Sequence, residues 1–181
     1  PTSMRAAVCM YGEQMFQAWG NLLHTVKTGE TGFDHHFGKP VFDYYEDHPA
    51  ASETFNQAMT DLGRTMYPNQ AITDAYDFSR HNVIIDVGGG HGDFLGDILA
   101  ANPECQGAVY DLENVIVGAA GTIAERGLTQ RAKVQSCDFF EEVMPGGDAY
   151  ILKRIVHDWD DTDAVRSLSN CADALPTDGR V

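Results

Sequence analysis

A run of glycines after a short apolar segment is the clearest chemical feature of the sequence. It reads Asp86-Val87-Gly88-Gly89-Gly90-His91-Gly92, between a β-branched stretch over 83–87 and an apolar helical pattern that starts at Phe94. Glycines at a strand-to-helix turn let the backbone approach a ligand closely, and the N–H groups at a helix start favour an anion. The run therefore predicts a ligand site at the end of a strand.

The spacing of these glycines separates two classes of ligand. A dinucleotide fingerprint has the order G-x-G-x-x-G, and with Gly88 and Gly90 as its first glycines the third position falls on Asp93. The order found, D-x-G-x-G-x-G with an acid beside the turn, suits a ligand that carries a carboxylate and an amino group. A nicotinamide oxidoreductase on a similar sheet stays open as the alternative, and binding of either cofactor would decide.

Acidic and aromatic residues follow the next two expected strands. Asp111 comes directly after 108–110, where a carboxylate can accept both ribose hydroxyl hydrogens of an adenosine. Asp138 follows 133–136, and it can accept the adenine amino proton while the ring of Phe139 packs on the purine. Each acid alone is equally well explained as a turn or helix cap, and the phenylalanine alone as core. Their placement at the ends of successive strands favours one shared ligand.

A histidine follows the fourth expected strand. His157 lies beyond the apolar stretch 149–152, and either Asp160 or Asp161 can cap the helix after it. Beside a cofactor site an imidazole is placed for proton transfer at neutral pH, although a single histidine is more often a surface or capping residue. A metal site of His157 with the nearby aspartates is the other reading. A strand-to-helix turn would splay those side chains, so we expect no metal.

The elements that must position these residues alternate between strands and helices from residue 82 onward. The expected strands are 83–87, 108–110, 133–136 and 149–152, and the expected helices start at Phe94, run over 115–126, and extend from Val165 to Leu175. This alternation predicts an α/β fold with a parallel sheet and right-handed crossovers. We expect a fifth strand to start at 179–181 and further strands to belong to the parent protein.

The preceding part of the sequence predicts helices only. Apolar residues recur at helical spacing over 4–26, with Gly29 as a stop. The next expected segments are a glycine- and aromatic-rich loop over 32–38, an amphipathic piece around Phe42 and Tyr45, and a helix capped by Ser52. We therefore expect a helical segment over 1–80 and a sheet domain over 81–181.

Composition excludes several classes of function. The net charge is −15 with acids spread along the chain, and such a surface repels the phosphates of nucleic acids. No apolar run reaches the ~18 residues of a membrane span, and the start does not resemble a signal peptide. Cysteines are widely spaced, which fits neither a zinc site nor a disulfide framework and favours the reducing cytoplasm: Cys9, Cys105, Cys137 and Cys171.

Taken in order, the motifs resemble those of the plant caffeate-type and bacterial hydroxyneurosporene-type O-methyltransferases. They are Asp86 to Gly90, Tyr110-Asp111-Leu112, Cys137 to Phe140, Leu152-Lys153, His157-Asp158-Trp159 and Ala174 to Gly179, with Ala18-Trp19-Gly20, Gly32-Phe33, Phe37 to Pro40 and Phe55 to Met59 upstream. The resemblance covers nearly the whole chain. It implies a Rossmann-like sheet that binds S-adenosylmethionine, without its C-terminal strands and preceded by an all-helical segment.

The resemblance also implies a role for each cofactor-site motif. Gly88 would contact the methionine part of S-adenosylmethionine, and Asp111 would bind the ribose. Asp138 and Phe139 would hold the adenine, and Lys153 would lie against the cofactor. Three positions depart from the family's usual residues without removing a contact: His91, Glu113 and Cys137.

The acceptor side of the site is implied in the same way. His157 would be the general base that deprotonates a hydroxyl of a small aromatic or polyketide acceptor. Phe55 and Met59 match positions that wall the acceptor pocket, although simple core explains them equally well. The family's N-terminal dimerisation domain has no counterpart here, and the glutamates that steady the histidine would lie beyond Val181. We expect a homodimer in the intact protein.

Two further alternatives stay open. A non-catalytic relative could bind S-adenosylmethionine for structure or regulation, but such a protein needs no base at His157. A metal-dependent catechol methyltransferase would lose its activity with a chelator.

Overall fold

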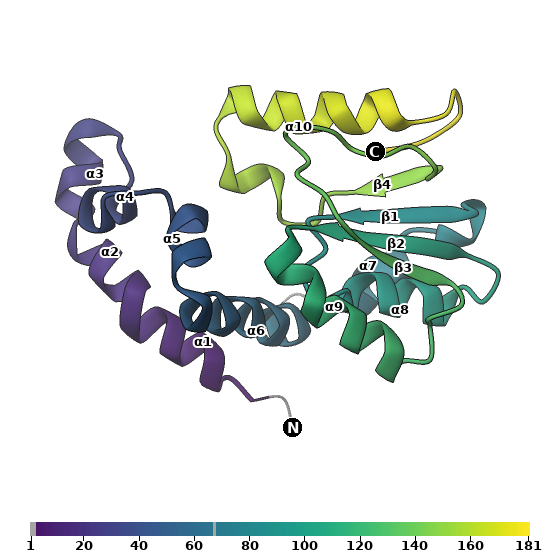
Figure 1. The fold of residues 1–181 in the computed structure, drawn as a ribbon, viewed down its shortest axis with the longest axis horizontal. Helices are drawn as coiled ribbons and strands as arrows, with labels where there is room; N and C mark the ends of the chain where they lie inside the picture. The colour runs from purple at the N-terminus through teal and green to yellow at the C-terminus, as the bar shows by residue number, and fades with distance from the viewer. Residues whose placement is uncertain (1–2, 67) are drawn as a thin grey trace. The chain divides into compact units, whose positions relative to one another are not determined.

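The chain forms two compact units. The computed structural model describes residues 3–66 and 68–181, and the units comprise Pro1–Pro68 and Asn69–Val181. The first unit is helical and the second contains the sheet (Figure 1). Helix α7 (Asn69–Ala75) and the 3-10 turn η2 (Phe78–Arg80) belong to the second unit, because Ile72 and Phe78 pack into the core beneath the sheet.

The second unit is built on a parallel sheet of strand order β3-β2-β1-β4. Its strands are β1 (Val83–Val87), β2 (Gln106–Asp111), β3 (Ala132–Ser136) and β4 (Ala149–Ile151). The α/β prediction is confirmed. Val87 pairs with Tyr110, and Asp111 pairs with Ser136, so β1, β2 and β3 end at the same edge. Arg180 forms one parallel bridge to Ala149, where a fifth strand is expected.

Helices cover both faces of the sheet. Helices α7, α8 (Asp93–Ala101) and α9 (Glu113–Glu125) lie on one face, and α10 (Asp161–Ala174) lies on the other (Figure 1). Side chains of β1 alternate between the two cores, with Ile84 in the first and Ile85 in the second. Burial of both faces explains why this strand begins with three consecutive apolar residues, Val83 to Ile85, rather than with alternating apolar and polar ones.

The first unit consists of short helices. They are α1 (Arg5–Met10), the π-helical turn η1 (Tyr11–Met15), α2 (Phe16–Gly20), α3 (Leu22–Thr28), α4 (Gly32–Phe37), α5 (Val41–Asp47) and α6 (Pro49–Met66). The helical pattern over 4–26 is interrupted at Asn21, whose amide donates to the Gln17 carbonyl. Gly29 adopts a φ of 82° and ends α3, as predicted.

Two local predictions are wrong in this unit. The expected loop over 32–38 contains helix α4, because the Thr31 hydroxyl accepts a hydrogen bond from the Asp34 amide and caps it. Ser52 does not cap the next helix. Helix α6 already starts at Pro49, whose ring presets a helical φ, and Ser52 is buried within it.

The helices over the described ranges are too short or too polar to cross a lipid bilayer.

Asp148 holds the start of the sheet together. Its Oδ2 accepts hydrogen bonds from the backbone and side-chain amides of Asn82 at 2.8 and 3.0 Å, and its Oδ1 accepts one from the Val83 amide at 3.0 Å. Burial raises the pKa of this carboxyl, but the hydrogen bonds outweigh it, and the net pKa lies below the usual range.

We expect Asp148→Ala to lower the free energy of unfolding of the second unit by roughly 2 kcal/mol, because three amide donors lose a charged acceptor. A lowered folded-state pKa means that this stabilisation is complete above the ordinary aspartate pKa and is lost as pH falls below it. Urea unfolding followed by Trp159 fluorescence in a Trp19→Phe background reports on this unit alone. The exposed Asp173→Ala should change stability by less than ~0.5 kcal/mol. Equal stability of Asp148→Ala and wild type would contradict the assignment.

Candidate functional site

The glycine turn packs tightly against the loop that follows β4. Gly88 has a φ of 67°, and a Cβ at this position would lie 2.4 Å from Ile155 Cδ1 and 3.7 Å from Phe139 Cε1. The Gly88 amide donates to the Tyr110 carbonyl at 2.7 Å. A left-handed φ and a close approach both require glycine here. The turn after β1 is thereby fixed beside the ends of β2 and β4.

A buried carboxyl lies beneath this turn. Asp86 is 2% exposed, and its Oδ2 has no hydrogen-bond partner within the described residues. This oxygen would lie 2.8 Å from a Cβ at Gly89, so it sits directly against the turn. Burial raises the pKa of Asp86 to about 7, and the charge of Lys153 partly offsets that rise. An unsatisfied buried acceptor is costly, and the ammonium group of a ligand at the turn could satisfy it.

Asp111 is tied to the same turn. Its Oδ2 accepts a hydrogen bond from the Gly90 amide at 2.8 Å, and its Oδ1 accepts one from the Leu112 amide at 2.8 Å. Burial raises the pKa of this carboxyl, and the two amide bonds oppose the rise. The structure therefore brings together the glycine turn and the acid after β2. A role of Asp111 in binding ribose stays a prediction.

The segment after β3 completes this edge. The Cys137 amide donates to the Asp111 carbonyl at 2.9 Å, which keeps the segment beside β2. The exposed Asp138 accepts a hydrogen bond from the Phe140 amide at 2.9 Å, as expected of a turn-capping residue. Phe139 is half-buried, with its ring centroid 4.6 Å from that of Phe140. Adenine binding by Asp138 and Phe139 stays a prediction.

His157 lies in the 3-10 turn η3 (Val156–Asp158), which is anchored on both sides. On one side Ile155 covers Gly88, and on the other the Trp159 ring lies 4.6 Å from that of Phe140. The His157 side chain is 61% exposed, and its Nε2 lies 3.5 Å from Asp158 Oδ1. The histidine is thus held at the edge where β1 and β3 end, with its imidazole accessible to solvent.

Asp160, one of the two expected caps, caps the helix that follows His157. Asp160 Oδ1 accepts hydrogen bonds from the amides of Thr162 and Asp163 at 2.9 and 3.0 Å, and Asp161 is the first helical residue. No group of three histidine, cysteine or acidic side chains is arranged to hold a metal ion among residues 3–66 and 68–181.

Lys153 enters the face of the sheet that α7 and α8 cover. Its Nζ donates to Asn69 Oδ1 at 2.5 Å and lies 4.6 Å from the centre of the Phe94 ring. Burial lowers the pKa of Lys153, and attraction to Asp86 opposes this. Asn69 cannot be recognised from the sequence, because an isolated asparagine 84 positions from its partner carries no local signal.

The two predicted acceptor residues belong to the first unit. The Phe55 ring lies 4.8 Å from that of Tyr45, and Phe55 and Met59 pack against a core that includes Met10 and Leu62. These contacts are those expected if Phe55 and Met59 are simply part of the hydrophobic core. A role in acceptor binding stays a prediction.

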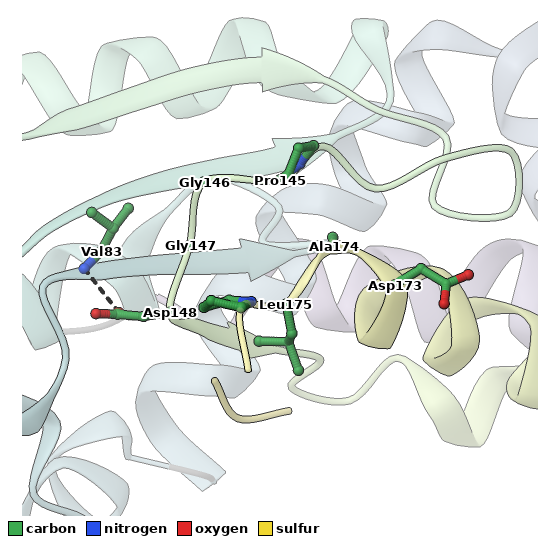
Figure 2. Close-up of a pocket in the computed structure, with 9 residues that line it drawn as sticks. Val83, Pro145, Gly146, Gly147, Asp148, Asp173, Ala174 and Leu175 are labelled. Atoms are coloured by element: carbon green, nitrogen blue, oxygen red, sulfur yellow. Dashed lines mark hydrogen bonds between the residues drawn. The ribbon is translucent and has the colours of Figure 1, made fainter. Parts of the chain in front are cut away.

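An open hollow of about 450 Å³ lies at the opposite edge of the sheet (Figure 2). It is lined by Val83, Pro145, Gly146, Gly147, Asp148, Asp173, Ala174, Leu175 and Pro176. None of the predicted site residues contributes to it, and Asp148 already accepts three hydrogen bonds there. We place the candidate site at the carboxyl edge instead, because the glycine turn, the unsatisfied Asp86 oxygen and the fixed Asp111 carboxylate meet there.

Comparison with known proteins finds relatives that are O-methyltransferases. The chain is 41% identical over 181 residues to the phenazine O-methyltransferase PhzM of Lysobacter antibioticus, covering all of this chain and 52% of that protein. It matches the crystal structure of LaPhzM with a TM-score of 0.94 at 41% identity, over 99% of this chain and 53% of that one.

A second structure contains ligands. It is an O-methyltransferase from neocarzinostatin biosynthesis in complex with S-adenosylmethionine and 2-hydroxy-5-methyl naphthoic acid, with a TM-score of 0.88 and 28% identity over 96% of this chain and 55% of that one. The chain spans about half the length of the curated relatives it matches.

The family model of the O-methyltransferase domain matches residues 19–181, which include every residue of the candidate site. The chain therefore belongs to the O-methyltransferase domain family.

Proposed function

We propose that the complete protein transfers a methyl group from S-adenosylmethionine to a hydroxyl of a small aromatic metabolite. The observation that carries the proposal is the 2.8 Å hydrogen bond from the Gly90 amide to Asp111, which joins the glycine turn to the acid after β2. The relative solved with S-adenosylmethionine and a naphthoic acid supports both the cofactor and the acceptor class.

The residues at the carboxyl edge fit this cofactor. Backbone at Gly88, above the unsatisfied oxygen of Asp86, suits the amino and carboxylate groups of methionine. Asp111 is fixed by two amides and would accept hydrogen bonds from the ribose hydroxyls, while Asp138 and Phe139 would hold the adenine. When bound, S-adenosylmethionine supplies an electrophilic methyl group.

His157 would make the acceptor hydroxyl a better nucleophile. A neutral imidazole can take the hydroxyl proton as the new bond forms, a contribution typically worth ~10²–10⁴-fold. Ile155 and Trp159, packed on either side of η3, hold the histidine backbone at the cofactor edge. Alignment of acceptor and methyl donor can contribute up to ~7–11 kcal/mol more.

We infer that the helical segment 1–80 links to a dimerisation domain and that Phe55 and Met59 wall the acceptor pocket. A homodimer is supported by large apolar side chains that are mostly exposed along α1–α3: Val8, Phe16, Trp19, Leu23 and Val26. A cytoplasmic location is supported by the four cysteines, which are all free thiols.

The first test is cofactor binding. We expect the complete protein to bind S-adenosylmethionine in isothermal titration calorimetry, and Asp111→Asn to weaken binding about 10-fold because a charged acceptor is lost. Titration with a nicotinamide dinucleotide on the same sample tests the alternative cofactor. Binding of the dinucleotide without binding of S-adenosylmethionine would refute the proposal.

The second test separates catalysis from binding. We expect His157→Gln in the complete protein to reduce turnover of a phenolic acceptor by ~10²–10⁴-fold, because the proton acceptor is lost, while S-adenosylmethionine affinity stays within a factor of two. Mass spectrometry of the product with labelled cofactor identifies the methylated atom. Full turnover in the variant would remove His157 from the mechanism. A protein that binds the cofactor but methylates none of a panel of phenols would instead support the binding-only alternative.

A further inference from the structure

A chain of polar contacts runs beneath the glycine turn from β4 to α9. The Lys153 ammonium donates to Asn69 Oδ1 at 2.5 Å, and Asn69 Nδ2 donates to Asp97 Oδ2 at 2.7 Å. Arg126 then donates to Asp97 Oδ1 at 2.7 Å. Asn69 is only 7% exposed, so both halves of its amide are used inside the protein.

The same chain of contacts fixes the helix that follows the turn. Arg126 donates through its other nitrogen to Asp93 Oδ1 at 2.8 Å, and Asp93 is the first residue of α8. Arg126 can lie across α8 because Gly96 has no side chain, since a Cβ there would be 2.8 Å from Arg126 Cδ. The first turn of α8, and with it the exit from the glycine turn, is therefore held by the guanidinium.

Asn69 occupies the position between a cation and an anion. Its carbonyl oxygen faces the Lys153 ammonium and its NH₂ group faces the Asp97 carboxylate, a pairing that requires a side chain able both to accept and to donate. A direct ion pair between Lys153 and Asp97 is thereby replaced by two hydrogen bonds to a neutral group. The positive charge of Lys153 also opposes the rise in the pKa of Asp86 under the glycine turn, and the Lys153 Nζ lies 4.6 Å from the centre of the Phe94 ring, just after that turn.

We propose that Asn69 is a positioning residue for cofactor binding, which holds the Lys153 ammonium over the Phe94 ring at the start of α8 and away from Asp97. This inference rests on the proposed function, in which Lys153 lies against S-adenosylmethionine. Asn69 touches neither cofactor nor acceptor in this role, and it acts through the lysine.

The test uses the complete protein and S-adenosylmethionine itself. We expect Asn69→Leu to weaken cofactor binding about 10-fold in calorimetry, because Lys153 then pairs directly with Asp97, while the acceptor KM changes less than twofold. Gln70→Ala is the matched control, because Gln70 lies on the same helix and its side chain donates to the nearby Asp74. Unchanged cofactor affinity in Asn69→Leu would overturn the inference, whereas failure of the wild type to bind would overturn the proposed function.

A double-mutant cycle separates positioning from a structural role. In a Lys153→Met background, Asn69→Leu should cause no further loss of affinity, because the group that Asn69 orients is gone. An equal 10-fold loss in both backgrounds would show that Asn69 does not act through Lys153.

Exchanging the amide of Asn69 with the carboxylate of Asp97 keeps the inference testable if the leucine variant does not fold. Asn69→Asp alone places two carboxylates side by side and should weaken cofactor binding about 10-fold. Adding Asp97→Asn removes that repulsion, gives Lys153 a carboxylate acceptor at position 69 and leaves an amide oxygen for Arg126 to donate to, so affinity should return to within threefold of wild type. A double variant that binds as weakly as Asn69→Asp would refute the role.

Discussion

The candidate site depends on the absence of a side chain at Gly88. Ile155 can lie where a Cβ would be 2.4 Å away only because no side chain is present, and the left-handed φ turns the chain back toward β2. That contact anchors one side of η3, and Trp159 on the phenylalanines anchors the other. The absence of a side chain at Gly88 therefore lets the glycine turn pack against the segment that carries His157.

The loop after β4 contains a strained residue between two residues that contact different elements. Arg154 has a φ of 63°, a left-handed conformation that costs a non-glycine residue roughly 1–2 kcal/mol. On one side of it Lys153 enters the region of α7 and α8, and on the other Ile155 covers the glycine turn. The strained residue lies between Lys153 and Ile155, which contact different parts of the candidate site.

Two buried acidic residues lie at the same edge of the sheet. Asp86 and Asp111 are acids withdrawn from water, and burial raises the pKa of both. Two backbone amides compensate Asp111, whereas one oxygen of Asp86 stays unsatisfied within the described residues and the nearby Lys153 supplies the opposing charge. Two buried acids at the glycine turn suit a cationic ligand better than a pyrophosphate, in agreement with the net charge of −15.

The strands, the glycine turn and the acids at the strand ends could be predicted from the sequence, because these follow from local periodicity and backbone chemistry. Helix α4 and the start of α6 were missed, since a threonine cap and a proline at the first helical position outweighed the glycine and serine signals. The hydrogen bonds that link Lys153 to Asn69, Asp97 and Arg126 are visible only in the folded chain. Such contacts join residues that are distant in the chain, and packing of helices on the sheet creates them rather than any pattern in the sequence.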